Sequence, residues 1–171
     1  MPTCPPDPPS IPDNVAHPFG RSGTGGASAP GTGSGSVPTA AAWWAVVTAD
    51  RDYFDGVIAA GGPDAASIEF PASCPERRFQ LSGRQLRIGR HSASQQMEPE
   101  IDLTGPPTDP GVSHLHAILI ARPDRTWAIL DPGSSNGTQL NGHELSTGVP
   151  YPLHPGDRVC LGAWTMLTIT A

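Results

Sequence analysis

Short apolar runs constrain the fold of this 171-residue chain more than any other feature. From Ala41 onward, runs rich in β-forming side chains recur, and most of them end at Gly, Pro, Asp or Asn. One stretch, around Asp50–Ala60, has helical character, and we expect Gly56 to interrupt it. So many short strands predict an all-β fold, a two-sheet antiparallel β-sandwich. The expected strands are Trp43–Thr48, Phe79–Leu81, Leu86–Arg90, Leu115–Ile120, Trp127–Asp131, Arg158–Leu161 and Trp164–Thr170.

The first 40 residues have a different composition from the rest of the chain. They contain 9 Pro and 7 Gly, with no hydrophobic periodicity. Such a segment buries too little apolar surface to offset its ordering entropy, so we expect a disordered tail or linker over residues 1–40. Residues 41–171 would then form one domain. Its residues 41–78 supply the first strands and an insertion, and residues 79–171 hold the motifs described below.

Composition and targeting signals exclude several classes of protein. No run of 18 apolar residues occurs and no secretory signal begins the chain, which predicts no association with a membrane. Cys4, Cys74 and Cys160 are too widely spaced for a disulfide framework or a CxxC metal site, which favours a cytoplasmic setting. The formal net charge of −6 argues against a general nucleic-acid binder, which needs a basic face.

Enzyme and metal motifs are also missing from the sequence. Ser113 lies close to His114 and His116, yet no GxSxG elbow and no lysine-containing phosphate loop is present. The two histidines would share one face of a strand, but no third metal ligand follows at a typical spacing. We therefore expect no catalytic residue, no metal and no cofactor.

Polar residues gather where the expected strands begin and end. Arg90 closes one strand, and Ser113 opens another with His116 three residues later. A polar loop, Asp131–Thr138, separates two apolar strands, and Asn141-Gly142 is typical of a type I′ turn. An arginine fork, hydroxyls and an amide on neighbouring loops form a suitable cradle for an oxyanion.

The order of these motifs resembles that of a forkhead-associated (FHA) domain, over about Phe79 to Ile169. The resemblance implies a β-sandwich with its binding loops at one end, and recognition of phosphothreonine in partner proteins. All ten cationic residues are arginines, as in a GC-rich genome, and we assign the chain to an actinobacterial type of FHA protein. The matching motifs are Gly89-Arg90, Ser113–Ala117, Gly133–Thr138, Asn141-Gly142, Gly156-Asp157 and Gly162.

The resemblance also implies a role for each site residue. Arg90 would pair with the phosphate, Ser113 and Ser135 would reach its oxygens, and Asn136 would fix the peptide backbone. His114 and Ser134 would make secondary peptide contacts. Structural support would come from Gly89, His116, Gly137 and Asn141, and the glycines, Gly142 among them, would serve positive backbone φ angles.

The function implied is that of a phosphothreonine-peptide-binding module that reads a Ser/Thr kinase. One alternative is a degenerate scaffold that binds partners without phosphate. Another is self-recognition of a phosphorylated tail threonine, such as Thr24, Thr32 or Thr39. The long loop His91–Glu100, with acidic Glu98 and Glu100 at its end, and the Pro-rich Thr104–Gly111 lie beside the site and would tune its specificity.

Overall fold

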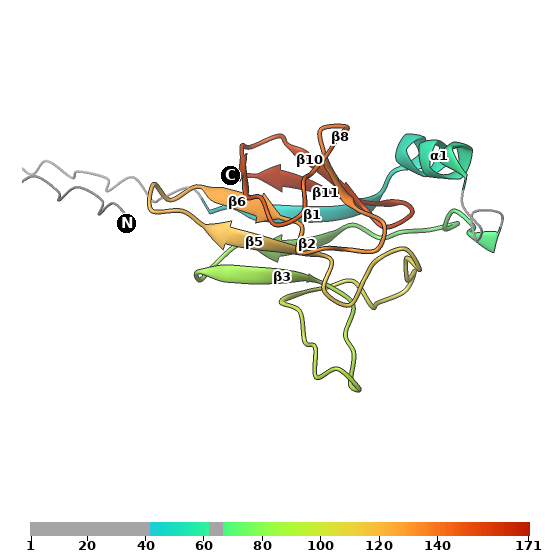
Figure 1. Cartoon of the computed structure of the whole chain (residues 1–171), viewed down its shortest axis with the longest axis horizontal. Coiled ribbons are helices and arrows are strands. Elements are labelled where there is room, and N and C mark those ends of the chain that lie inside the picture. The colour runs from blue at the N-terminus through green and yellow to red at the C-terminus, as the bar shows by residue number, and fades with distance from the viewer. Residues whose placement is uncertain (1–41, 62–66) are drawn as a thin grey trace, which may run out of the picture. The chain divides into compact units, whose positions relative to one another are not determined.

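The computed structural model describes residues 42–61 and 67–171, so the expected tail and its threonines lie outside the described residues. Two β-sheets form two layers (Figure 1). The first sheet contains, in spatial order, β2 (Arg77–Gln80), β1 (Trp44–Ala49), β11 (Thr165–Thr170), β10 (Arg158–Leu161), β7 (Thr138–Leu140) and β8 (His143–Glu144). The second contains β4 (Ile101–Asp102), β3 (Gln85–Gly89), β5 (Ala117–Ala121), β6 (Trp127–Leu130) and β9 (Tyr151–Leu153). The predicted all-β sandwich is confirmed.

Alternation along the strands builds the core between the two sheets. In β11, Leu167 and Ile169 are fully buried, whereas Met166, Thr168 and Thr170 are partly exposed. Ala45 and Val47 of β1 face the same core. Every strand pairing is antiparallel except that of β3 with β4, which is parallel.

The helix α1 (Arg51–Ala60) corrects one sequence-based prediction, because it continues through Gly56 without a break. Asp50 caps its start, and the carboxylate accepts a hydrogen bond of 2.7 Å from the backbone N–H of Tyr53. Phe54 is buried against Ala163 and Trp164. This cap and this packing offset the cost of about 1 kcal/mol that a glycine imposes inside a helix. Within the described residues, no helix is long and apolar enough to span a membrane.

Several strand boundaries also differ from the prediction. The strand expected over Leu115–Ile120 begins only at Ala117. Ser113, His114 and His116 therefore lie in the loop before it, and the two histidines share no strand face. The strands β4, β7, β8 and β9 were not predicted. Each of them has two or three residues, too few for a visible alternation.

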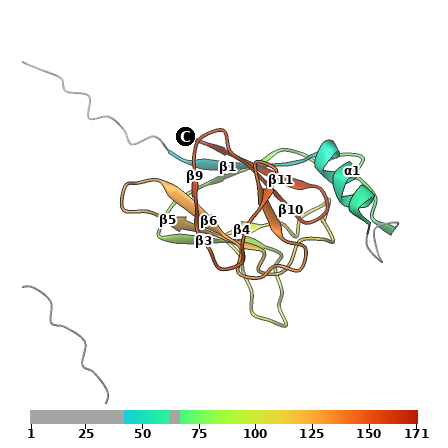
Figure 2. The same ribbon diagram turned by 45° about the horizontal axis from the view of Figure 1, so that its top comes forward.

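The register of the strands brings several loops to one end of the sandwich. Leu161 pairs with both Thr138 and Thr165, so the loop before β7 adjoins the turn between β10 and β11. Ala49 also pairs with Thr165, and α1 therefore emerges at this same end of the sheet (Figures 1 and 2). The loops that carry Ser113 and Asn136 lie at this end.

Candidate functional site

Arg90 follows directly on the last residue of β3 and is fixed by the loop before β5. Its backbone N–H donates to the carbonyl of Ser113 over 3.2 Å, and its side-chain Nε donates to the carbonyl of Val112 over 2.6 Å. In the described part of the chain, Arg90 forms no ion pair with a carboxylate. The guanidinium thus keeps its terminal N–H donors and its positive charge for another acceptor.

The hydroxyls of Ser113 and Ser135 meet although 22 residues separate them in the sequence. Their Oγ atoms are 3.5 Å apart, and the backbone N–H of Ser135 donates to Ser113 Oγ over 3.2 Å. Ser135 is exposed, whereas Ser113 and Arg90 are half-buried. The loops therefore bring two hydroxyls together, and the Arg90 guanidinium is held by Val112, the residue before Ser113.

His116 joins these two loops from below. It is fully buried, and its Nδ1 accepts a hydrogen bond of 2.9 Å from the backbone N–H of Ser113. Because Nδ1 accepts, the proton of the neutral ring is on Nε2, which lies 3.0 Å from the carbonyl of Gly137 and donates to it. Burial lowers the pKa of His116 and outweighs the opposite effects of the Gly137 carbonyl and of the charges of Asp131 and Asp109.

Asp131 organises the loop that carries Ser135 and Asn136. Its carboxylate is buried and accepts hydrogen bonds of 2.7 Å from the backbone of Gly133 and of Ser134, 2.7 Å from the Ser134 hydroxyl and 2.8 Å from the Thr138 hydroxyl. Burial alone would raise the pKa of Asp131, but these hydrogen bonds together lower it. Ser134 was predicted to contact the peptide, but its hydroxyl donates its hydrogen bond to Asp131 inside the loop.

Asp109 performs the same task for the loop that carries Ser113. Its buried carboxylate accepts from the backbone N–H of Gly111 over 2.8 Å and from the backbone N–H groups of Ala163, Trp164 and Thr165 over 3.0 Å each. The Thr165 hydroxyl adds a bond of 2.7 Å. These bonds tie the loop before β5 to the turn between β10 and β11.

Glycine is needed at two positions of the site for different physical reasons. Gly137 has a φ of +73°, as expected for a position that favours glycine. Gly89 has no positive φ, which corrects the reason given from sequence. A Cβ atom there would overlap the carbonyl of His114 and lie 2.9 Å from the carbonyl oxygen of Ser113, so only glycine allows this close approach.

Asn136, Asn141 and His114 were also predicted at the site. Asn136 is exposed, and its amide donates to the carbonyl of Gly111 over 2.8 Å. Asn141 and Gly142 have φ angles of +52° and +82°, but the Asn141 side chain contacts Asp157 and Arg158 at the far end of β7. The structure therefore does not bring Asn141 to the loops of the cradle. His114 is half-buried and makes no side-chain hydrogen bond within the described residues.

The long loop after Arg90 is anchored through its acidic end. Glu100 binds Arg87 through both carboxylate oxygens, at 2.8 and 3.2 Å, and also accepts from the Arg87 backbone N–H over 2.7 Å. The hydrogen bond from the Arg87 side chain lowers the pKa of Glu100 to about 2. Of the two residues of the predicted acidic patch, Glu98 and Glu100, the second is therefore neutralised by Arg87.

Sequence reasoning missed the two organising aspartates, although a signal was present. Asp109 and Asp131 each begin an Asp-Pro-Gly triplet, and each accepts from the N–H of the glycine two residues later. This is the hydrogen bond of an Asx-turn, for which aspartate before Pro-Gly is a known preference.

Part of the chain matches a known protein family. A model of the FHA domain matches residues 86–162. Protein FraH from the cyanobacterium Nostoc sp. is 35% identical over 83 residues, which are 48% of this chain and 28% of FraH. The chain thus spans little more than a quarter of FraH, and this cyanobacterial relative does not support the predicted actinobacterial type.

Solved structures share the fold at low sequence identity. The FHA domain of an Arabidopsis thaliana hypothetical protein is 23% identical with a TM-score of 0.51, and the match covers 75% of this chain and 84% of that one. The FHA domain of CT664 from Chlamydia trachomatis is 20% identical with a TM-score of 0.52, covering 77% and 98%. The family model thus identifies an FHA domain over residues 86–162, and the solved structures show the same fold.

Proposed function

We propose that this FHA domain binds phosphothreonine in partner proteins and acts as a reader of Ser/Thr kinase activity, by binding and without catalysis. The observation that supports the proposal is the contact between Ser113 and Ser135, together with Arg90 held by Val112 directly beside Ser113 in the chain. A phosphothreonine carries a charge of about −1.5 to −2 near neutral pH and three acceptor oxygens. Within the described residues Arg90 has no carboxylate partner, and its charge together with the two adjacent hydroxyls of Ser113 and Ser135 complements such a group.

Buried hydrogen bonds hold the loops of the cradle in place before a ligand binds. His116, Asp109 and Asp131 hold the three loops from inside by buried hydrogen bonds. A cradle held in this way loses little conformational entropy when a ligand binds. Asn136 follows Ser135 in the chain, and the family resemblance implies that its side chain binds the backbone of the peptide.

The proposal extends to the partners and to the setting of the protein. The ligands are phosphothreonine-containing proteins or peptides, and the phosphate is added by an upstream kinase. Nucleic acid, metal and cofactor have no part in this binding. The cytoplasm is the compartment in which such signalling would take place.

Fluorescence polarisation of labelled peptide libraries tests the proposal. The libraries carry a fixed phosphothreonine, phosphoserine or unmodified threonine, and we expect binding of the phosphothreonine set above the others. Arg90→Ala should weaken this binding about ten- to a hundredfold, because a charge-assisted hydrogen bond contributes about 1.5–3 kcal/mol. Arg90→Lys keeps the charge but loses the planar fork and should fall between the two proteins.

Arg125→Ala is the matched control for charge. It removes one arginine in the exposed turn between β5 and β6, away from the cradle. We expect this variant to bind like the unchanged protein. Equal binding of phosphorylated and unmodified peptides would instead indicate a scaffold that binds without phosphate. Normal affinity of the Arg90→Ala variant would show that the phosphate is bound elsewhere.

A further inference from the structure

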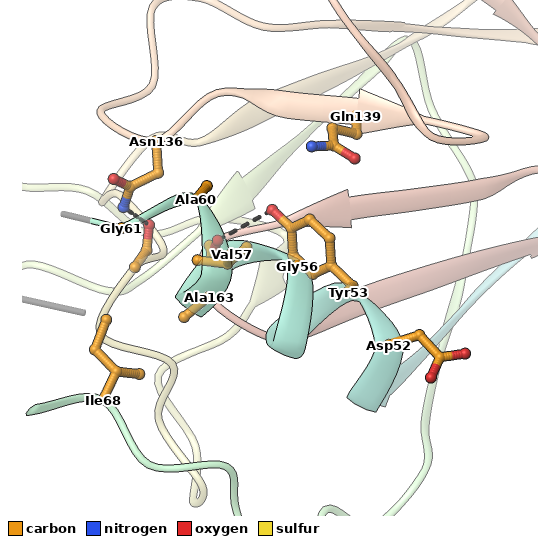
Figure 3. A pocket seen from close by; sticks show the side chains of 12 residues that line it. Asp52, Tyr53, Gly56, Val57, Ala60, Gly61, Ile68, Asn136, Gln139 and Ala163 are labelled. Carbon is orange, nitrogen blue, oxygen red and sulfur yellow. Dashed lines mark hydrogen bonds between the residues drawn. The ribbon is translucent and has the colours of Figure 1, made fainter. Parts of the chain in front are cut away.

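A pocket of about 520 Å³ opens directly beside Asn136, between the loops of the cradle and the inserted helix α1. Figure 3 shows Asn136 and Gln139 facing the helix across this pocket. The hydrogen bond from Asn136 to Gly111 forms part of its rim, and both residues line it. Asn136 follows Ser135 in the chain, so the pocket adjoins the loop that carries Ser135, although Arg90, Ser113 and Ser135 do not themselves line it.

The helix is a fixed wall of this pocket. Asp50, which caps α1, pairs with Arg158 of β10, and its backbone N–H donates to the carbonyl of Trp164 over 2.8 Å. The Tyr53 hydroxyl donates to the carbonyl of Gly162 over 3.1 Å, drawn as a dashed line in Figure 3. Burial of Phe54 adds an apolar contact to the same turn. These contacts tie α1 to the strand and turn that also support the Ser113 loop.

The chemistry of the lining selects one kind of occupant. Val57, Ala60, Ile68 and Ala163 give it apolar walls. Among the described residues that line it, Asp52 is the only charged one. This carboxylate disfavours an acidic occupant, and the apolar walls favour a hydrocarbon side chain.

Gly56 leaves the space open. It lies on the pocket side of α1, and a Cβ atom added there would meet no atom within 4 Å. A larger residue would improve helix propensity at this position, since glycine is the least favourable residue in a helix interior apart from proline. The helix therefore carries at this position the residue that fills the pocket least.

We infer that this pocket binds an aliphatic side chain that flanks the phosphothreonine of the same partner peptide, so that α1 determines part of the sequence specificity. The inference rests on the proposed phosphothreonine binding. It assigns the flanking contact to a helix inserted between β1 and β2, and Asn136 is the residue shared by the two sites.

A position scan of the peptide tests the inference with the full chain. Each position from four before to four after phosphothreonine is occupied in turn by Leu, Gly, Glu or Arg. In the unchanged protein, one flanking position should bind Leu about tenfold or more tightly than Gly, as expected for a buried aliphatic side chain. Glu at that position should bind no better than Gly.

Gly56→Leu should reduce this Leu-to-Gly ratio to near one, because its side chain fills the pocket. Ala59→Leu is the matched control, since it adds the same side chain on an exposed residue of α1 outside the pocket, and it should keep the ratio. The ratio compares two peptides on one protein sample, so an inactive fraction does not alter it. Melting temperatures verify folding, and Ile68→Ser, on the opposite wall, should also lower the ratio if Gly56→Leu fails to fold.

The outcomes separate the two proposals. Phosphothreonine binding without any flanking preference, a preference for Arg or Glu, or a Leu preference that survives in the folded pocket variants overturns the inference and leaves the proposed function intact. Loss of the ratio in Ala59→Leu as well would also overturn it. Failure of the unchanged protein to bind any phosphothreonine peptide overturns both.

Discussion

Replacing His116 with alanine should lower the stability of the domain and, at the same time, the dependence of that stability on pH. The imidazole is fully buried and makes two hydrogen bonds, one from the N–H of Ser113 and one to the carbonyl of Gly137. Both backbone groups lose their partner in the variant. Each lost bond costs about 1 kcal/mol and the cavity left by the ring adds to this, for a total of about 2–4 kcal/mol.

The pH dependence follows from the lowered pKa of His116. In the unfolded chain the imidazole takes up a proton as the pH falls through its ordinary pKa of 6.5, whereas burial resists protonation in the folded protein. Below pH 6.5 the unfolded state therefore holds more protons, and stability falls as the pH falls. Above that pH the contribution of the neutral ring is fully present. If the ring stays neutral in the folded state, the free energy of unfolding should fall by about 1.4 kcal/mol between pH 7.5 and pH 5.5.

Urea denaturation at pH 5.5, 6.5 and 7.5, followed by tryptophan fluorescence, measures both effects. The stability difference between the unchanged protein and His116→Ala should shrink as the pH falls. The carboxyl groups with lowered pKa values, among them Glu100 and Asp131, titrate below this range. His143→Ala, at an exposed histidine of β8, is the matched control and should keep the pH dependence.

Two results would refute the reasoning about His116. If the stabilities of His116→Ala and of the unchanged protein fell in parallel with pH, the buried ring would not be the titrating group. If the variant lost peptide binding at an unchanged melting temperature, His116 would be a direct ligand and not a support.

Two further substitutions test the packing of the loops. Gly89→Ala should destabilise the domain by about 1–3 kcal/mol in urea denaturation and weaken phosphopeptide binding, because its Cβ would displace the carbonyl of His114 next to Arg90; unchanged stability would mean that the loop moves at no cost. Asp109→Asn removes the charge and one acceptor oxygen beneath the Ser113 loop and should cost at least about 2 kcal/mol by the same assay. A loss below 0.5 kcal/mol would show that the Asp109 hydrogen bonds are replaced by others.

The strands with clear alternation and the residues at their ends could be predicted from the sequence. The run Trp164–Thr170 places Leu167 and Ile169 on one face, and β11 buries that face. Arg90 was predicted to close a strand and Ser135 to lie in a polar loop; the structure places Arg90 directly after β3 and Ser135 in the loop before β7. Period-two patterning and turn residues are local signals, so one sequence is enough to detect them.

The supports inside the loops could not be predicted in the same way. Asp109 accepts hydrogen bonds from residues 54 to 56 positions later, across the turn between β10 and β11. His116 reaches Gly137, 21 residues away. Such contacts depend on the register of whole strands, and in the case of β7, a strand of three residues, the strand itself was not predicted.

The helix shows how a failed local prediction can indicate function. Gly56 argued against a helix because its propensity is poor, yet α1 forms around it since Asp50 caps the start and Phe54 is buried. A residue that weakens its own element and makes no compensating contact is expected at sites where something other than stability constrains the sequence. At Gly56 the candidate constraint is the space itself, because any side chain there would extend into the pocket beside Asn136. Gly56→Ala should therefore stabilise the domain by roughly 0.5–1 kcal/mol. Variants with larger residues at this position should lose their selectivity for the residue that flanks phosphothreonine, in proportion to the volume of the new side chain.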